Sequence, residues 1–130
     1  MQFSLAILAL AGAAVAKAIP RDDEPAIVAV PNAPGTPDVG TGAITHLYIC
    51  INSDFKGACT NLEVNTGGCY NLLGNWNDAV TSLGPDKGTT CTIWQDAGCS
   101  GRSLGNIVNP GIYNLADWNF NDIMSSLRCN

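Results

Sequence analysis

The sequence predicts an all-β domain in which two four-stranded Greek-key units pack as a sandwich and are cross-linked by disulfide bonds. Three observations carry this prediction. A motif in the middle of the chain recurs near its end, short β-rich segments alternate with turn residues, and six cysteines are present. No stretch shows the sustained 3.6-residue apolar period of an amphipathic helix.

The repeat is clearest in two heptapeptides. Residues 77–83 have the sequence NDAVTSL, and residues 121–127, which lie 44 positions later, have the sequence NDIMSSL. A second match lies upstream, where GCYNL at 68–72 corresponds to GIYNL at 111–115 with an offset of 43. A period of this length is typical of a duplicated supersecondary unit whose two copies pack together.

Each unit is expected to contribute four short strands. Apolar and β-branched segments are bounded by Asn, Ser, Gly and Pro, which is the pattern of strands joined by reverse turns. The units span about 46–85 and 89–130. The expected strands are 46–51, 58–64, 69–72 and 80–83 in the first unit, and 89–94, 102–108, 112–115 and 124–129 in the second. A helical turn is expected near 73–78 or 116–122.

The residues that precede this domain differ from it in composition. The apolar run 5–15, followed by the small residues around Lys17, is typical of a secretory signal peptide and predicts one at 1–18. Five prolines and an acidic run mark 19–43 as an extended, disordered spacer or pro-segment, which leaves 44–130 as the folded domain. The sequence thus predicts a secreted, extracellular protein. Stable membrane insertion is not expected, because no other apolar stretch approaches the length of a bilayer span.

The cysteines are expected to form three disulfides. They are Cys50, Cys59, Cys69, Cys91, Cys99 and Cys129. An even count behind a signal peptide favours cross-links, whereas a zinc site would need CxxC pairs or more than one histidine. Six cysteines allow 15 connectivities. Because each unit carries three, at least one bridge must join the units. The pair Cys91–Cys129 is favoured, since these residues begin and end the second unit, and the other pairings stay open.

Charge and residue content argue against two classes of function. The domain has seven acidic and four basic residues, a net charge of −3, and no basic patch with interleaved aromatic residues, so nucleic acid is not an expected partner. An enzyme is disfavoured because His46 is the only histidine, the thiols should be oxidised, and no nucleophile–histidine–acid set is present. No feature of the sequence identifies a protein target.

The repeated motifs resemble those of the βγ-crystallin superfamily. Its Greek-key unit begins with an aromatic residue, four further residues, an aromatic, any residue and glycine. In calcium-binding members it ends with Asn/Asp-Asn/Asp-x-x-Ser/Thr-Ser. Here CINSDFKG at 50–57 and WQDAGCSG at 94–101 correspond to the first pattern, and the two heptapeptides correspond to the second. Cys50 and Cys99 depart from the family pattern, because each replaces one aromatic residue.

The resemblance covers 46–130 and implies that the domain binds two calcium ions, with ligands from both units in each site. The implied side-chain and adjacent carbonyl ligands are Asp78, Ala79, Thr81, Asp122, Ile123 and Ser125. A carbonyl from the first hairpin turn of each unit, at Ile51 or Gln95, is implied as a further ligand. The chemistry agrees with the resemblance, since Ca²⁺ is a hard cation that takes six to eight oxygen ligands.

Two alternatives to this hypothesis stay open. Asx and Ser/Thr side chains also cap turns, so the motifs could be structural, and the final serines Ser82 and Ser126 are expected to cap turns in either case. The protein could instead be a secreted inhibitor or a toxin-like effector, roles that occur on this fold. It would then act through an exposed loop at 66–69 or 85–90. A secreted domain that calcium stabilises is the main hypothesis.

The other notable side chains are expected to be structural. His46 should be exposed and without a partner. The aromatic residues expected to pack in the core or against the site are Tyr70, Trp76, Trp94, Tyr113 and Trp118.

Overall fold

The computed structural model describes residues 25–31, 33 and 42–130. In this part of the chain the elements are β1 Ile27–Ala29, β2 Ile44–Asn52, η1 Ser53–Phe55, β3 Lys56–Asn65, β4 Cys69–Leu72, η2 Gly74–Trp76, β5 Ser82–Pro85, β6 Thr90–Asp96, β7 Ser100–Val108, η3 Leu115–Trp118 and β8 Ser126–Cys129, where η marks a short 3-10 helix. The predicted signal peptide, 1–18, and residues 19–24, 32 and 34–41 of the predicted spacer lie outside the described residues.

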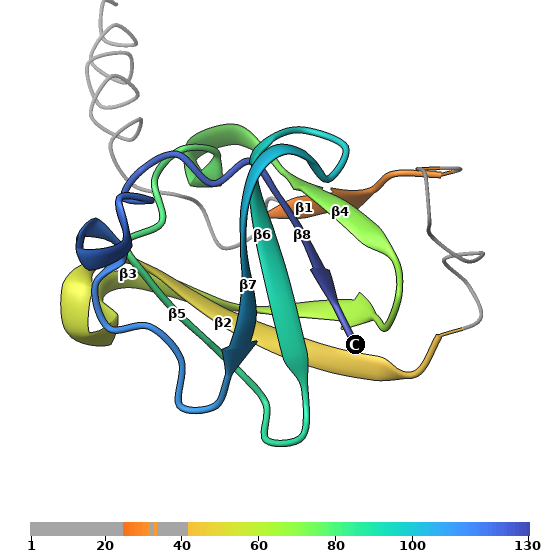
Figure 1. Ribbon diagram of the computed structural model, residues 1–130, viewed down its shortest axis with the longest axis horizontal. Helices are drawn as coiled ribbons and strands as arrows, with labels where there is room; N and C mark the ends of the chain where they lie inside the picture. Colours follow the sequence, from red (N-terminus) through yellow and green to blue (C-terminus); the bar gives the residue numbers. More distant parts are fainter. Residues whose placement is uncertain (1–24, 32, 34–41) are drawn as a thin grey trace, which may run out of the picture.

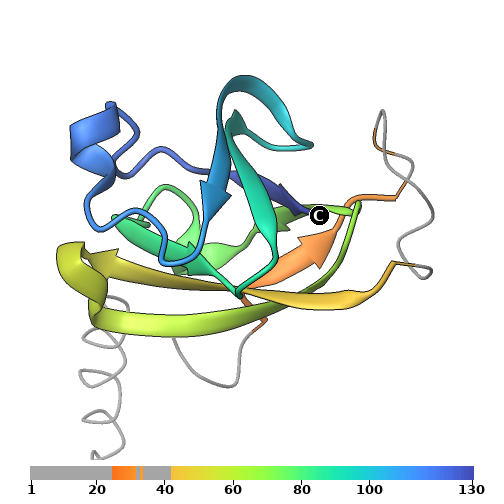
Figure 2. The same cartoon turned by 60° about the horizontal axis from the view of Figure 1, so that its bottom comes forward.

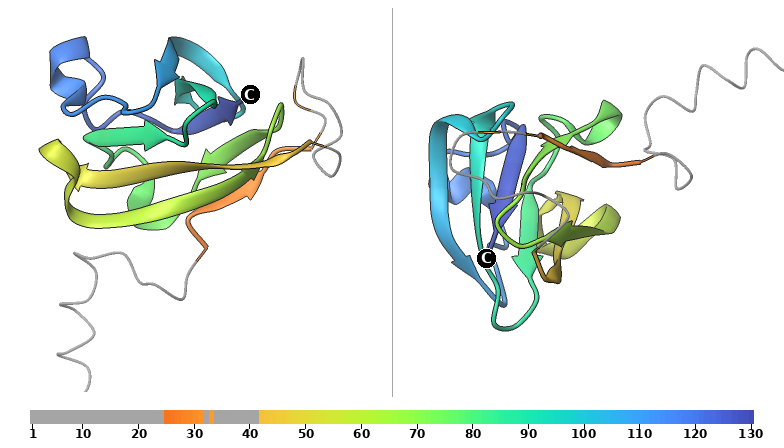
Figure 3. Two further views of the ribbon diagram at one scale, coloured as in Figure 1. Left: turned by 90° about the horizontal axis from the view of Figure 1, so that it is seen from below. Right: turned by 90° about the vertical axis from the view of Figure 1, so that its right-hand side faces the viewer.

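The strands form two antiparallel sheets that face one another (Figure 1). One sheet has five strands in the order β1-β4-β8-β6-β7, and the other has three in the order β3-β2-β5. The two layers are seen from the side in Figure 3, and the β2–β3 hairpin forms the lower layer in Figure 2. The predicted all-β sandwich is confirmed.

Each unit places part of its chain against the other unit's sheet. β4 of the first unit pairs with β8 of the second, with Tyr70 opposite Leu127. In the reciprocal position, Ile112 of the second unit forms a bridge with Leu83 of the first. Because the units exchange segments in this way, their apolar side chains fill one shared core, whose buried members come from both halves of the chain.

The expected strand at 112–115 is not formed. Only Ile112 pairs with a neighbouring strand, and η3 already begins at Leu115. The side chain of Asn114 accepts a hydrogen bond from the backbone N–H of Ala116 at 3.1 Å, which caps the first turn of η3 and ends the extended segment. Helical turns are found at both places where one was expected, as η2 and η3.

The prediction of a disordered spacer is wrong for residues 27–29, which form β1. This strand pairs antiparallel with the edge of β4, with Ile27 opposite Leu72. The backbone N–H of Val30 continues the ladder to the carbonyl of Cys69 at 2.9 Å. The prediction of disorder was based on the prolines. The segment AIVAV between two of them is nevertheless apolar and rich in β-branched residues, which favour a strand. One side of β1 packs on the core, and Val28 on the other side is exposed.

All six cysteines are paired, and the favoured Cys91–Cys129 bridge is confirmed. Cys50–Cys59 closes the first hairpin of the first unit, and Cys69–Cys99 is the bridge between units that the count required. The two bridges with sequence separations of 30 and 38 each add about 3–4 kcal/mol by restricting the unfolded chain. In the described part of the chain, no helix has the length and apolarity needed to cross a bilayer.

The docking of β1 can be tested at two adjacent positions. Ile27→Asp should lower the free energy of unfolding by about 1–3 kcal/mol, because it sets a charge against the core. That loss corresponds to a fall in Tm of at least about 4 °C in thermal unfolding followed by circular dichroism. Val28→Asp is the matched control and should change Tm little, since Val28 faces solvent. Equal Tm values for the two variants would show that β1 does not pack on the domain.

Candidate functional site

The two repeated motifs lie side by side and exchange backbone hydrogen bonds. The N–H of Asp78 donates to the carbonyl of Met124 at 3.1 Å, and the N–H of Asp122 donates to the carbonyl of Val80 at 3.2 Å. The two bonds join equivalent positions, because the offset of 44 converts one into the other. The motifs are therefore related by an approximate twofold axis, and each fixes the backbone of the other.

The side chains of the motifs are paired across the same axis. Thr81 donates a hydrogen bond through Oγ1 to Oδ1 of Asp122 at 3.3 Å, and Ser125 donates through Oγ to Oδ1 of Asp78 at 3.1 Å. The sequence shows an aspartate and a hydroxyl within each motif, whereas the structure pairs the aspartate of one motif with the hydroxyl of the other. Both aspartates are exposed, and both hydroxyl residues are half-buried.

The aspartates sit in an unusual backbone conformation. Asp78 has φ 60° and Asp122 has φ 58°, in the left-handed region that residues other than glycine rarely adopt. Asp and Asn tolerate this region better than most residues, because their short polar side chains can bond locally. The conformation costs about 1–2 kcal/mol at each position. Its occurrence at the same position in both motifs identifies it as a feature of the repeated unit.

Backbone oxygens lie next to each aspartate–hydroxyl pair. The N–H of Thr81 bonds to the carbonyl of Cys50, the residue before Ile51, at 2.9 Å. The N–H of Ser125 bonds to the carbonyl of Trp94, the residue before Gln95, at 2.8 Å. The strand register shifts at both places, so that Ile51 and Gln95 have no partner in the register of the hairpin. The residues just before the first hairpin turn of each unit therefore lie beside a hydroxyl residue of the motif, and the carbonyls of Ile51 and Gln95 remain candidate ligands.

Two more carbonyls are free to act as acceptors. Among the described residues, no hydrogen bond is made to the backbone carbonyl of Ala79 or Ile123. Both residues are half-buried and directly follow the aspartates. Each place thus has a paired carboxylate and hydroxyl, and the residue that follows the aspartate has an unbonded carbonyl.

These places are not clusters of charged ligands. Within the described residues, no group of three or more His, Cys, Asp or Glu side chains is arranged to hold a metal ion. With one carboxylate at each place, a bound cation would depend mainly on neutral oxygens and on water.

The final serine of each motif has a structural role, as predicted. Ser82 and Ser126 are fully buried. Ser126 donates to the carbonyl of Asp96 at 2.6 Å and accepts from the N–H of Cys99 at 2.9 Å. Ser82 makes the same two bonds one repeat earlier, at 2.7 and 3.0 Å. Each serine therefore pins the first hairpin of its unit to the last strand.

The expectation for His46 is wrong, because the side chain has two acidic neighbours. Its Nδ1 lies 2.9 Å from Oδ2 of Asp86, and its Nε2 lies 3.7 Å from Oε1 of Glu63. These partners are 40 and 17 positions away in the chain, so only the pairing of strands brings them together.

One of the two loops suggested for an inhibitor is not available. At 66–69, Gly68 and Cys69 are buried, and the N–H of Gly67 bonds to the carbonyl of Cys129 at 2.8 Å. In the other loop, at 85–90, residues 86–88 are exposed.

Two aromatic residues expected to pack inside are on the surface. Tyr113 is 51% exposed and contacts the ring of Phe55 edge-on at 5.0 Å between centroids. Trp118, on η3, is 55% exposed. Tyr70 and Trp76 are buried as expected. The difference follows from the absent strand at 112–115, because η3 turns that part of the second unit outward.

Comparison with known proteins identifies the fold. No protein-family model matches the sequence, and no curated protein matches it. A βγ-crystallin domain from Flavobacterium johnsoniae superposes on 65% of this chain and 92% of its own length with 27% identity and a TM-score of 0.54. The chain has the βγ-crystallin fold. Its two Greek-key units and shared core agree with the resemblance found in the sequence.

Two other βγ-crystallin structures agree with this assignment. A structure from work on the evolution of the eye-lens βγ-crystallin domain fold covers 80% of this chain and 96% of its own length, with 19% identity and a TM-score of 0.56. The N-terminal domain of Protein S covers 65% of this chain and 94% of its own length, with 23% identity and a TM-score of 0.54. At these identities the similarity establishes the fold alone.

The role of the buried serines can be tested by removing one hydroxyl. Ser126→Ala should lower the free energy of unfolding by about 1–3 kcal/mol, because it leaves a buried N–H and a buried carbonyl without their partner. Urea denaturation measures this loss. Ser103→Ala, at an exposed serine of β7, is the control and should change stability by less than about 0.5 kcal/mol. A Ser126→Ala variant as stable as the control would contradict the structural role.

Proposed function

We propose that this βγ-crystallin domain is a secreted calcium-binding module whose folded state is stabilised by two ions. The observation that supports the proposal best is the crossed pairing of Asp78 with Ser125 and of Asp122 with Thr81. Each pair sets a carboxylate and a hydroxyl oxygen 3.1 or 3.3 Å apart. Secretion is inferred from the predicted signal peptide and agrees with the three disulfides.

The donor set fits calcium in kind. Its atoms are carboxylate, hydroxyl and carbonyl oxygens, with no imidazole and no free thiol, which favours a hard cation over zinc or copper. Calcium tolerates irregular geometry and completes its shell with water, whereas magnesium demands near-ideal octahedral geometry. A single carboxylate in each site keeps the charge low. We therefore expect weak binding, with a Kd toward roughly 10⁻⁴–10⁻³ M, the range of extracellular calcium-binding modules.

The crossed arrangement explains how the ion would act on stability. Each ion would take ligands from both units, so it would tie the units together at the point where their motifs meet. An ion that binds only the folded state at 100 times its Kd adds about 2.7 kcal/mol per site. For a small domain this is a large fraction of the total stability.

Calcium titration tests the proposal directly. Isothermal titration calorimetry should show two ions per chain, and saturating calcium should raise Tm by several degrees relative to the chelated protein. Glu63→Gln is the control, because it removes an exposed carboxylate on β3 that belongs to neither pair. If neither binding heat nor a shift in Tm is observed, the motifs only cap turns and the proposed function is wrong.

The crossed assignment makes a sharper prediction with four variants. Asp122→Asn and Thr81→Val should remove the same ion, and Asp78→Asn and Ser125→Ala should remove the other. Asparagine is chosen because it also tolerates the left-handed backbone conformation. Combining the two changes of one pair should leave one ion bound, whereas Asp78→Asn with Asp122→Asn should leave none. Loss of both ions on combining Thr81→Val with Asp122→Asn would overturn the crosswise pairing.

A further inference from the structure

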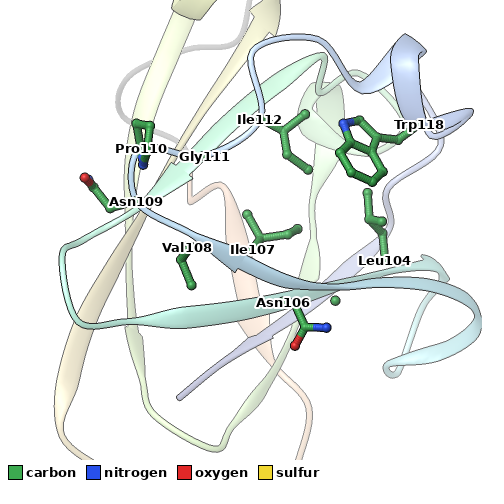
Figure 4. Close-up of a pocket in the computed structure, with 10 residues that line it drawn as sticks. Leu104, Asn106, Ile107, Val108, Asn109, Pro110, Gly111, Ile112 and Trp118 are labelled. Atoms are coloured by element: carbon green, nitrogen blue, oxygen red, sulfur yellow. The ribbon is translucent and has the colours of Figure 1, made fainter.

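A pocket of about 240 Å³ lies between β7 and the segment 109–118, outside the calcium-site candidates. Figure 4 shows Leu104 and Ile107 of β7 pointing toward Ile112 and the indole of Trp118, so that four apolar side chains converge on one space. The remaining lining residues are Gly105, Asn106, Val108, Asn109, Pro110 and Gly111. None of the described residues that line the pocket is charged.

The pocket joins a buried floor to an exposed apolar rim. Ile107 is 3% exposed and belongs to the core, whereas Val108 and Trp118 are 53% and 55% exposed. An isolated exposed apolar side chain is ordinary, but large apolar side chains around a concavity are typical of binding sites.

In the first unit, the strand that corresponds to segment 112–115 has its outer edge covered by another strand. The offset of 43 relates segment 112–115 to β4. The free edge of β4 is covered by β1, whose Ile27 and Ala29 pack against the core. No described strand covers segment 112–115 in this way, and the pocket opens beside it. The second unit therefore leaves apolar surface open where the first unit covers it with its own chain.

Two backbone groups of the segment that follows the pocket's loop already have hydrogen-bond partners. The carbonyl of Tyr113 accepts a hydrogen bond from the N–H of Asp54 at 2.8 Å, and the N–H of Ala116 is capped by the side chain of Asn114. These two groups of segment 112–118 are therefore already bonded. The pocket is a concavity with apolar walls, which favours a compact molecule over an extended peptide.

We propose that this pocket binds a small apolar molecule, an aromatic or branched aliphatic compound of about ten non-hydrogen atoms. The size follows from the volume, since an apolar cavity of about 150 Å³ holds benzene. Trp118 forms one wall and stacks on the ligand, and Leu104, Ile107 and Ile112 form the others.

The pocket shares no residue with the two aspartate–hydroxyl pairs. Binding should therefore be the same with calcium and with chelator. Failure of the calcium proposal would leave this one untouched.

Titration of the intact ¹⁵N-labelled chain with 4-ethylphenol tests the proposal. Chemical-shift changes should concentrate at residues 104–112 and at the indole N–H of Trp118, and erythritol, a polar molecule of similar size, should cause none. Shifts that are absent at millimolar 4-ethylphenol, or spread evenly over the surface, would overturn the proposal. Shifts at 104–118 that appear on concentrating the protein without ligand would also overturn it, because the pocket would then be a contact between copies.

Three variants sharpen the test. Trp118→Ala should weaken binding at least about fivefold, because it removes an apolar wall worth more than 1 kcal/mol. Leu104→Phe should weaken it as well by filling the space, and its amide spectrum shows whether the fold is kept. Ile44→Ala removes an exposed apolar side chain that does not line the pocket, and its affinity should stay within about twofold. Equal affinities for Trp118→Ala and Ile44→Ala would show that the pocket is not the site.

Discussion

The structure depends on the reciprocal hydrogen bonds between the two copies of one motif. The N–H of Asp78 bonds to the carbonyl of Met124, and that of Asp122 bonds to the carbonyl of Val80, so each motif is held by the backbone of the other. The same contact brings the aspartate of one unit to the hydroxyl of the other. It also explains why the two Greek-key units share one core, since their chains cross at this point. Packing and the candidate cation sites therefore have a common origin.

The duplicated sequence was enough to predict much of this arrangement. The recurrence of NDxx[TS]S at an offset of 44 and of GxYNL at an offset of 43 implies two equivalent units, and the number of cysteines in each unit implies a bridge between them. The pairing of Cys91 with Cys129 followed from their places at the ends of one unit. The repeat alone could not show that the side-chain pairs cross between motifs, because nothing in a linear repeat distinguishes contacts within a copy from contacts between copies. Only the family resemblance implied that each site takes ligands from both units.

The errors have local physical causes. β1 was missed because the prolines around it outweighed a five-residue apolar segment that is stable only against β4. The strand at 112–115 was predicted from its similarity to β4, but the side chain of Asn114 caps a helical turn there. Trp118, at the end of the capped turn, is exposed and lines the pocket beside β7. The partners of His46 were also missed, because strand pairing across tens of residues is not visible in composition or spacing.

The bridges Cys69–Cys99 and Cys91–Cys129 enclose overlapping stretches of chain. A protease that cuts once anywhere between Cys69 and Cys129 therefore leaves both fragments covalently joined. Within the domain, the stretch between Cys59 and Cys69 is where one cut would separate the halves, and most of it is strand β3, paired along β2. A chain of this kind tolerates nicking in its second unit and is vulnerable mainly where its backbone is already protected.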